Sequence, residues 1–129
     1  MENERQGNIR KVMILEDEDD ILLLYKDYLK RKGHYIIASS TTADEALKDY
    51  EKYVPDVVII DYKLPGKKNG LEAAREIVTK DPRARILIIS AFEKVKQEIA
   101  QTNFFRDKQI PVLIKPIKLS RLGEIISKF

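Results

Sequence analysis

The chain has 129 residues, of which 43% are hydrophobic and 35% charged, a balance typical of one compact globular domain rather than a disordered or fibrous protein. The sequence contains no run of roughly 18 apolar residues, and its polar start, MENERQGNIR, lacks the apolar core of a secretory signal. There is no cysteine for disulfides or thiolate chemistry, and the net charge of +3 comes from basic residues scattered along the chain. We therefore expect a cytoplasmic protein that contacts neither nucleic acid nor membrane directly.

Strand-like and helix-like segments alternate along the chain. Residues 1–9 are polar and without period, so we expect a loose tail followed by a single domain over residues 10–129. In chain order the predicted elements are a strand at 12–16, a helix over 21–29, a strand at 34–39, a helix opened by a capping box at 42–45, a strand at 56–61, a helix after Gly70, a strand at 86–90, a helix over 92–99, a strand at 111–115 and a helix at 119–129.

The strand at 56–61, DVVIID, is a nearly continuous β-branched run of the kind that is buried on both faces of a sheet. Five strands alternating with five helices imply a parallel sheet, because parallel neighbours need long crossovers, and right-handed crossovers place helices on both faces. The predicted fold is therefore an α/β, doubly wound, five-stranded parallel sheet. In such sheets the ligand crevice lies at the carboxyl ends of the strands.

Polar residues follow the strands at that edge of the predicted sheet. They are Glu16, Asp17, Asp61, Ser90 and Lys115. Three carboxylates close together repel one another unless a cation compensates, and with only oxygen ligands at hand the expected cation is Mg²⁺. Lys115 adds a point charge suited to a phosphoryl oxygen, and Ser90 adds a hydroxyl donor.

This set of side chains suits phosphoryl transfer to a carboxylate. Asp61 is the best nucleophile because it stands alone at the end of the most central strand, and Glu16 and Asp17 then hold the metal ion. The simpler interpretation of the run LEDEDD is a helix start, where carboxylates favour the helix dipole. The joint pattern of all five positions favours a phosphoryl-transfer site with a metal ion over a simple helix start.

Residues 10–129 resemble the receiver domain of two-component response regulators, of the stand-alone kind found in chemotaxis. The resemblance rests on Glu16-Asp17 after VMIL, Asp61 in DVVIIDYKLPG, Ser90-Ala91 after ILII, and Lys115-Pro116. It implies a flavodoxin-like (βα)5 fold with strand order 2-1-3-4-5.

The resemblance also implies a function. Asp61 would accept a phosphoryl group from a sensor histidine kinase, as a phosphoacceptor that assists its own phosphorylation rather than as a turnover enzyme. Mg²⁺ would be bound by Asp17, Asp61 and the backbone carbonyl of Lys63, with Glu16 nearby. Because the chain ends where its last helix ends, we expect the signal to pass to another protein, through the face formed by the fourth helix, fifth strand and fifth helix.

Three positions depart from the usual family pattern. Glu16 stands where Asp is commoner, the segment 61–70 is one residue longer than usual, and Val112 stands where Tyr or Phe is usual. Two alternatives therefore stay open. One is a pseudo-receiver that binds partners without phosphorylation; the other is an Asp-nucleophile phosphatase of the haloacid dehalogenase type, whose acidic motif follows the first strand.

Two features are predicted to be structural rather than functional. His34 is the only histidine, and its place at the start of an edge strand predicts a surface residue rather than a catalyst. The pair Phe104-Phe105 is predicted to pack beneath the loop before the fifth strand, with partner binding as the alternative.

Overall fold

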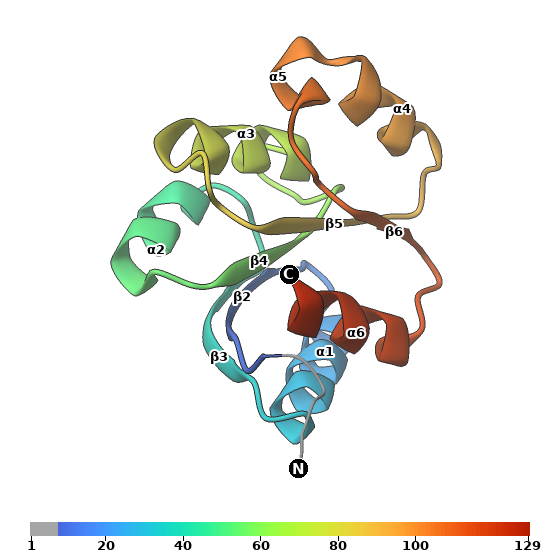
Figure 1. Cartoon of the computed structure of the whole chain (residues 1–129). Helices are drawn as coiled ribbons and strands as arrows, with labels where there is room; N and C mark the ends of the chain where they lie inside the picture. The colour runs from blue at the N-terminus through green and yellow to red at the C-terminus, as the bar shows by residue number, and fades with distance from the viewer. Residues whose placement is uncertain (1–7) are drawn as a thin grey trace.

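The sheet of this protein has helices on both faces, as the computed structural model in Figure 1 shows for residues 8–129. The strands are β2 (Lys11–Leu15), β3 (Tyr35–Ser40), β4 (Val57–Asp61), β5 (Ile86–Ser90) and β6 (Val112–Ile114). The helices are α1 (Asp19–Arg31), α2 (Ala46–Tyr53), α3 (Gly70–Lys80), α4 (Lys94–Gln101), α5 (Asn103–Arg106) and α6 (Leu119–Lys128). The tail predicted for residues 1–9 falls mostly outside the described residues.

All neighbouring strands are parallel, and their order is β3-β2-β4-β5-β6. Since β2 is the first of the five predicted strands, this arrangement confirms the predicted order 2-1-3-4-5. Every residue of the central strand β4 is buried, as its β-branched sequence VVIID predicted. No helix within residues 8–129 is both long enough and apolar enough to cross a membrane.

Alternate residues of each strand feed two separate cores. Val12 and Ile14 of β2 face α1 and α6, whereas Met13 and Leu15 face the side covered by α2, α3, α4 and α5. This alternation is the two-residue period of a strand, and both faces are apolar because both are covered. Because helices cover both faces, polar side chains of the sheet gather at the carboxyl ends of the strands.

The capping box forms at a different helix from the one predicted. The N-cap of α2 is Glu45, with no side-chain cap among the described residues, and the hydroxyl of Thr42 instead accepts a hydrogen bond from the backbone N–H of Asp44 at 3.4 Å. A complete capping box is present at α3, where Asn69 and Glu72 each accept from the other's backbone N–H. Thr42 is therefore used within its own turn.

The predicted fourth helix is present as α4, and a short helix that was not predicted, α5, follows it. Thr102 has an extended conformation between them and closes α4 by donating from its hydroxyl to the carbonyl of Glu98 at 2.6 Å. The turn carries Phe105 into the core, where its ring packs edge-on against Phe104 at 5.0 Å. The prediction that this pair packs structurally is confirmed.

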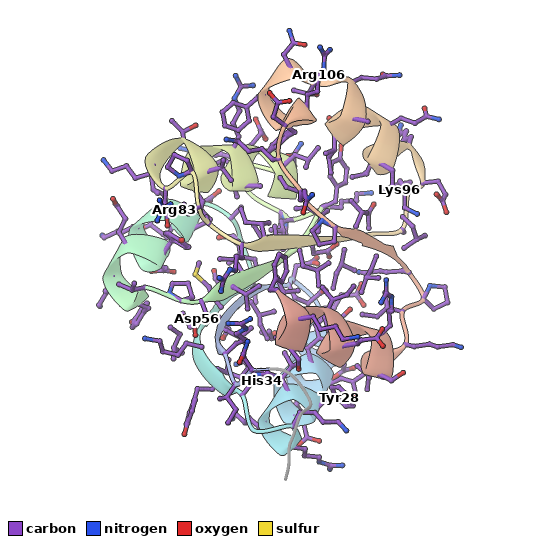
Figure 2. The ribbon with its side chains drawn as sticks, in the orientation of Figure 1. Tyr28, His34, Asp56, Arg83, Lys96 and Arg106 are labelled. Atoms are coloured by element: carbon purple, nitrogen blue, oxygen red, sulfur yellow. The ribbon has the colours of Figure 1, made fainter. Side chains whose placement is uncertain are left out.

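His34 is buried, with 5% of its surface exposed, so its predicted surface position is wrong. Its Nδ1 accepts a hydrogen bond from the backbone N–H of Arg10 at 2.9 Å, and its Nε2 lies 3.5 Å from the hydroxyl of Ser127. Figure 2 shows His34 where β3 begins. Burial, and secondarily the charge of Arg10, lower the pKa of His34. Segments distant in the sequence therefore cover the edge that looked exposed.

Candidate functional site

The polar residues predicted to form the site lie together at one edge of the sheet. Glu16 directly follows β2, Asp61 and Ser90 are the last residues of β4 and β5, and Lys115 directly follows β6. Because the four strands are parallel and in register, their carboxyl ends meet at the same edge. Glu16, Asp61 and Ser90 are buried, and burial of the two carboxyl groups is unusual without a binding role or a charge partner.

Lys115 connects the two buried carboxyl groups. Its Nζ donates a hydrogen bond to Oδ2 of Asp61 at 3.3 Å and lies 3.7 Å from Oε1 of Glu16. Burial alone would lower the pKa of Lys115, but the charges of Asp61 and Glu16 outweigh it and raise that pKa. The lysine is therefore held as an ammonium ion beside the proposed nucleophile.

Three consecutive acids form a tight group at the same edge. Carboxylate oxygens of Glu16, Asp17 and Glu18 lie within 4.8 Å of one another. Oε2 of Glu16 accepts a hydrogen bond from the backbone N–H of Glu18 at 3.1 Å, whereas its buried Oε1 has no hydrogen-bond partner among the described residues. A buried carboxylate oxygen without a hydrogen bond is costly, and the ammonium ion of Lys115 at 3.7 Å offsets that cost only in part, so this atom fits a further cation.

The pKa values of Glu16 and Asp61 show that nearby positive charge only partly offsets the cost of burying their carboxylates. Burial raises the pKa of Glu16 to about 7, and the nearby Asp61 adds to the rise while Lys115 opposes it. Burial also raises the pKa of Asp61, against the opposing charge and hydrogen bond of Lys115. One lysine therefore compensates two buried carboxyl groups incompletely.

The residues present fit Mg²⁺. All donors are carboxylate or carbonyl oxygens, which hard divalent ions prefer, and one of them is a buried oxygen that accepts no hydrogen bond from the described residues. Glu18 was not among the predicted site residues, although it belongs to the same acidic run. In the sequence it is indistinguishable from Asp19 and Asp20, which begin α1 instead.

Ser90 is positioned by the loop that follows β5. Its Oγ accepts a hydrogen bond from the backbone N–H of Phe92 at 2.9 Å and donates to the carbonyl of Phe92 at 3.3 Å. The carbonyl of Phe92 also accepts from the N–H of Val95 at 3.2 Å, in the first turn of α4. The hydroxyl is therefore linked to the start of α4.

A pocket of about 500 Å³ opens above these groups. Its lining comprises Asp17, Glu18, Asp61, Lys63, Leu64, Pro65, Ala91, Phe92 and Lys115. All of the predicted site residues thus lie in this pocket or directly beneath it, with Glu16 and Ser90 forming the buried layer.

The loop between β4 and α3 is held where α3 begins and in its middle. A Cβ on Gly70 would meet the carbonyl oxygen of Asp61 and lie 2.8 Å from Cα of Tyr62, so only glycine lets the start of α3 approach the strand end this closely. In the middle of the loop, the backbone N–H of Lys67 donates to Asp44 at 3.1 Å. The loop is therefore fixed at two points while Asp61 lines the pocket.

Comparison with known proteins agrees with this geometry. The response regulator receiver domain family matches residues 12–127. The chain is 28% identical over 119 residues to the chemotaxis protein CheY of Thermotoga maritima, covering 92% of this chain and 96% of that protein.

Solved structures give the same result. A LuxR-family two-component response regulator from an Aurantimonas species has a TM-score of 0.79 and 27% identity, with 92% of this chain and 83% of that chain covered. The response regulator PhyR of Brucella abortus has a TM-score of 0.75 and 26% identity; the match covers 95% of this chain but 48% of PhyR, so this chain spans about half of PhyR. The chain belongs to the response regulator receiver domain family of two-component signalling.

Proposed function

We propose that this protein accepts a phosphoryl group on Asp61 from a phosphohistidine of a sensor histidine kinase and signals through a partner protein in the cytoplasm. The observation that carries the proposal is the buried Asp61 at the pocket floor, with the Nζ of Lys115 at 3.3 Å and an acidic group beside it. A carboxylate held between an ammonium ion and a candidate cation site is suited to act on phosphorus.

In the transfer, an oxygen of Asp61 forms a bond to phosphorus while the phosphorus–nitrogen bond of the donor breaks. The electron pair of that bond stays on the imidazole, which leaves as a neutral ring because its other nitrogen carries the proton. Lys115 remains an ammonium ion and interacts with the negative charge on the phosphoryl oxygens. The hydroxyl of Ser90, which now donates to the Phe92 carbonyl, is available to donate to a phosphoryl oxygen instead.

Mg²⁺ would be held by Asp17, Asp61 and the backbone carbonyl of Lys63, with Glu16 beneath them. When bound, it supplies positive charge that neutralises the charge developing on the transferred group. The charge of Lys115 offsets the cost of burying the carboxylates of Glu16 and Asp61 only in part. The negative charge that remains favours binding of a cation in this pocket.

A pseudo-receiver that only binds partners is the second candidate. Val112 and the longer loop favour it, because both depart from the usual receiver pattern. The contacts of Lys115 with Asp61 and Glu16 favour a phosphoacceptor, since a chain without that chemistry has no need of a buried nucleophile and an ammonium ion beside it. We propose the phosphoacceptor, with the signal leaving through the face of α4, β6 and α6.

Intact-mass measurement after incubation with Mg²⁺ and acetyl phosphate tests the proposal. We expect one phosphoryl adduct on the unchanged protein and none on Asp61→Asn. Asp20→Asn is the matched control, because Asp20 is an exposed acid in the first turn of α1. Equal adduct on the unchanged protein and Asp61→Asn would contradict the assignment, and no adduct on any protein would favour the pseudo-receiver.

A further inference from the structure

The C-terminal end of α6 receives hydrogen bonds from the segment that leads into β2. The last carbonyl groups of a helix have no hydrogen-bond partner within the helix itself. The guanidinium group of Arg10 donates to the carbonyl of Ile126 at 3.4 Å and to the backbone oxygen of Phe129. The backbone N–H of Asn8 donates to the carbonyl of Ser127 at 3.0 Å. This segment before β2 therefore caps the last turn of α6.

The buried ring of His34 contacts both partners of this cap. Its Nδ1 accepts a hydrogen bond from the backbone N–H of Arg10 at 2.9 Å, and its Nε2 lies 3.5 Å from the hydroxyl of Ser127. The backbone N–H of His34 donates to the carbonyl of Leu29 at 3.0 Å, which fixes the residue to the end of α1 where β3 begins (Figure 2). The imidazole therefore links three segments that are distant in the sequence.

These contacts determine which nitrogen of His34 carries the proton. An Nδ1 that accepts a hydrogen bond has its lone pair available, so the proton of the neutral ring is on Nε2. Uptake of a second proton would turn Nδ1 into a donor that faces the N–H donor of Arg10. Two donors cannot form a hydrogen bond with each other, so protonation of His34 and its contact with Arg10 exclude each other.

The charges around His34 do not stabilise an imidazolium ion. Burial, and secondarily the charge of Arg10, lower the pKa of His34. Three segments meet at the ring, residues 8–11, 30–35 and 124–129, and their charged side chains are Arg10, Lys11, Lys30, Arg31, Lys32, Glu124 and Lys128. The one acid in this set, Glu124, already pairs with Arg121 at 2.7 Å and with Lys128 at 3.9 Å. The other titratable side chain, Tyr35, is exposed. Burial and charge therefore both oppose protonation of the ring in place.

We propose that His34 is an acid-sensitive latch: uptake of a proton by its imidazole releases residues 8–10 from the ring and, with them, the last turn of α6. A released imidazole has the ordinary pKa of 6.5, so the population of the open latch should rise as pH falls below that value. The inference goes beyond the proposed function and does not depend on it. His34 precedes β3 at the amino-terminal edge of the sheet, whereas Asp61 ends β4 at the carboxyl-terminal edge.

Nuclear magnetic resonance tests the latch on the unchanged protein, because His34 is the only histidine and its ring signals need no assignment by mutation. The ring nitrogen shifts should place the proton on Nε2 at neutral pH. Amide hydrogen exchange is then compared at two pH values and corrected for the intrinsic pH dependence of exchange. From about pH 7.5 to about pH 5.5, protection should fall by about tenfold at Asn8, Arg10 and residues 125–128.

The amides of β4 and β5 serve as the internal control. They should keep their protection over the same pH change, because release of the latch is local and does not unfold the sheet. Glu16 also titrates in this range, but it follows β2 at the opposite edge, so a residue-by-residue measurement separates the two groups.

Four variants locate the effect. His34→Asn retains a side-chain acceptor that takes up no proton near neutral pH, so its protection should be equal at the two pH values. Arg10→Gln removes the guanidinium cap, so the last turn of α6 should already be less protected at neutral pH. Arg83→Gln changes an exposed arginine before β5 and should behave as the unchanged protein. Asp61→Asn should also keep the full pH response, which separates this inference from the proposed phosphorylation.

Any of four results overturns the inference. The first is a neutral ring with its proton on Nδ1, and the second is equal protection of Arg10 at the two pH values. The third is a loss of protection in β4 and β5 as large as at Arg10, which would mean global unfolding. The fourth is the same loss in His34→Asn, which would mean that another group takes up the proton. The first three results come from the unchanged protein, so the test stands even if His34→Asn fails to fold.

Discussion

The Nζ of Lys115 lies 3.3 Å from Oδ2 of Asp61, although 54 residues separate the two in the sequence. The contact exists because β4, which ends at Asp61, and β6, which directly precedes Lys115, end at the same edge of the sheet on either side of β5. Lys115 opposes the effect of burial on the pKa of Asp61 and so keeps the carboxylate available as a nucleophile.

Replacing Lys115 by Met should slow formation of the phosphoryl adduct by at least about tenfold, because the variant loses the charge that offsets the phosphoryl oxygens. The rate is measured by intact mass at fixed Mg²⁺ and acetyl phosphate. Lys118→Met is the matched control, since Lys118 is exposed and three residues away. An unchanged rate in Lys115→Met would remove the lysine from the mechanism.

Mg²⁺ should raise the melting temperature, because it binds the native acidic group and relieves its repulsion. At Mg²⁺ about 100 times its dissociation constant, the gain in the free energy of unfolding is about 2.7 kcal/mol. Asp17→Asn should reduce the gain, and Asp20→Asn, outside the group, should keep it. If Mg²⁺ leaves the unchanged protein's melting temperature where it was, the acidic run is only a helix start.

Without Mg²⁺, Glu16 should make the protein less stable as pH rises. Its pKa is about 7 in the folded state against 4.5 when solvated, so the folded state binds more protons between these values. Its contribution is fully present below pH 4.5 and is lost as pH rises through 7, a loss of ~3 kcal/mol.

Urea unfolding at pH 5 and pH 8 in a chelator measures this loss, and Glu16→Gln should lack it. His34, whose lowered pKa makes the protein less stable as pH falls below 6.5, contributes equally to both proteins and cancels in the comparison. The same pH dependence in both proteins would show that Glu16 does not carry the proton.

A phosphoryl mimic should loosen residues 93–110 while β6 stays nearly fixed. The hydroxyl of Ser90 now holds the backbone of Phe92, and turning it toward a phosphoryl oxygen would break both contacts and release the first turn of α4. Val112 has no polar tip to reorient with it.

Amide hydrogen exchange with and without beryllium fluoride checks this prediction. Exchange should rise in residues 93–110 and stay constant at Val112, and Ser90→Ala should abolish the response. Large changes around Val112 with none in 93–110 would contradict the proposed route.

The strands and the site were predictable because each of their signals is local. A β-branched run ending in a polar residue marks both a buried strand and its carboxyl end, so Asp61 and Ser90 could be placed from short segments. The parallel topology then brings them together.

What the sequence could not predict depends on distant contacts. His34 is buried by Arg10 and by Ser127, which is 93 residues away. The small side chain of Val112 is visible in the sequence, but the pocket of about 360 Å³ that it lines together with Phe105 also requires the turn at Thr102 that carries Phe105 inward. Local pattern has no information on such packing.

Reductive trapping tests the central claim most directly. Borohydride reduces an acyl phosphate but not a free carboxylate, so phosphorylated protein treated with it carries a stable change at the acceptor. Trypsin should release residues 53–63 as one peptide, and fragmentation distinguishes Asp61 from Asp56 within it. The account predicts the change at Asp61 alone and only after incubation with acetyl phosphate and Mg²⁺; a change at Asp17, Glu18 or Asp56 with Asp61 unmodified would contradict it.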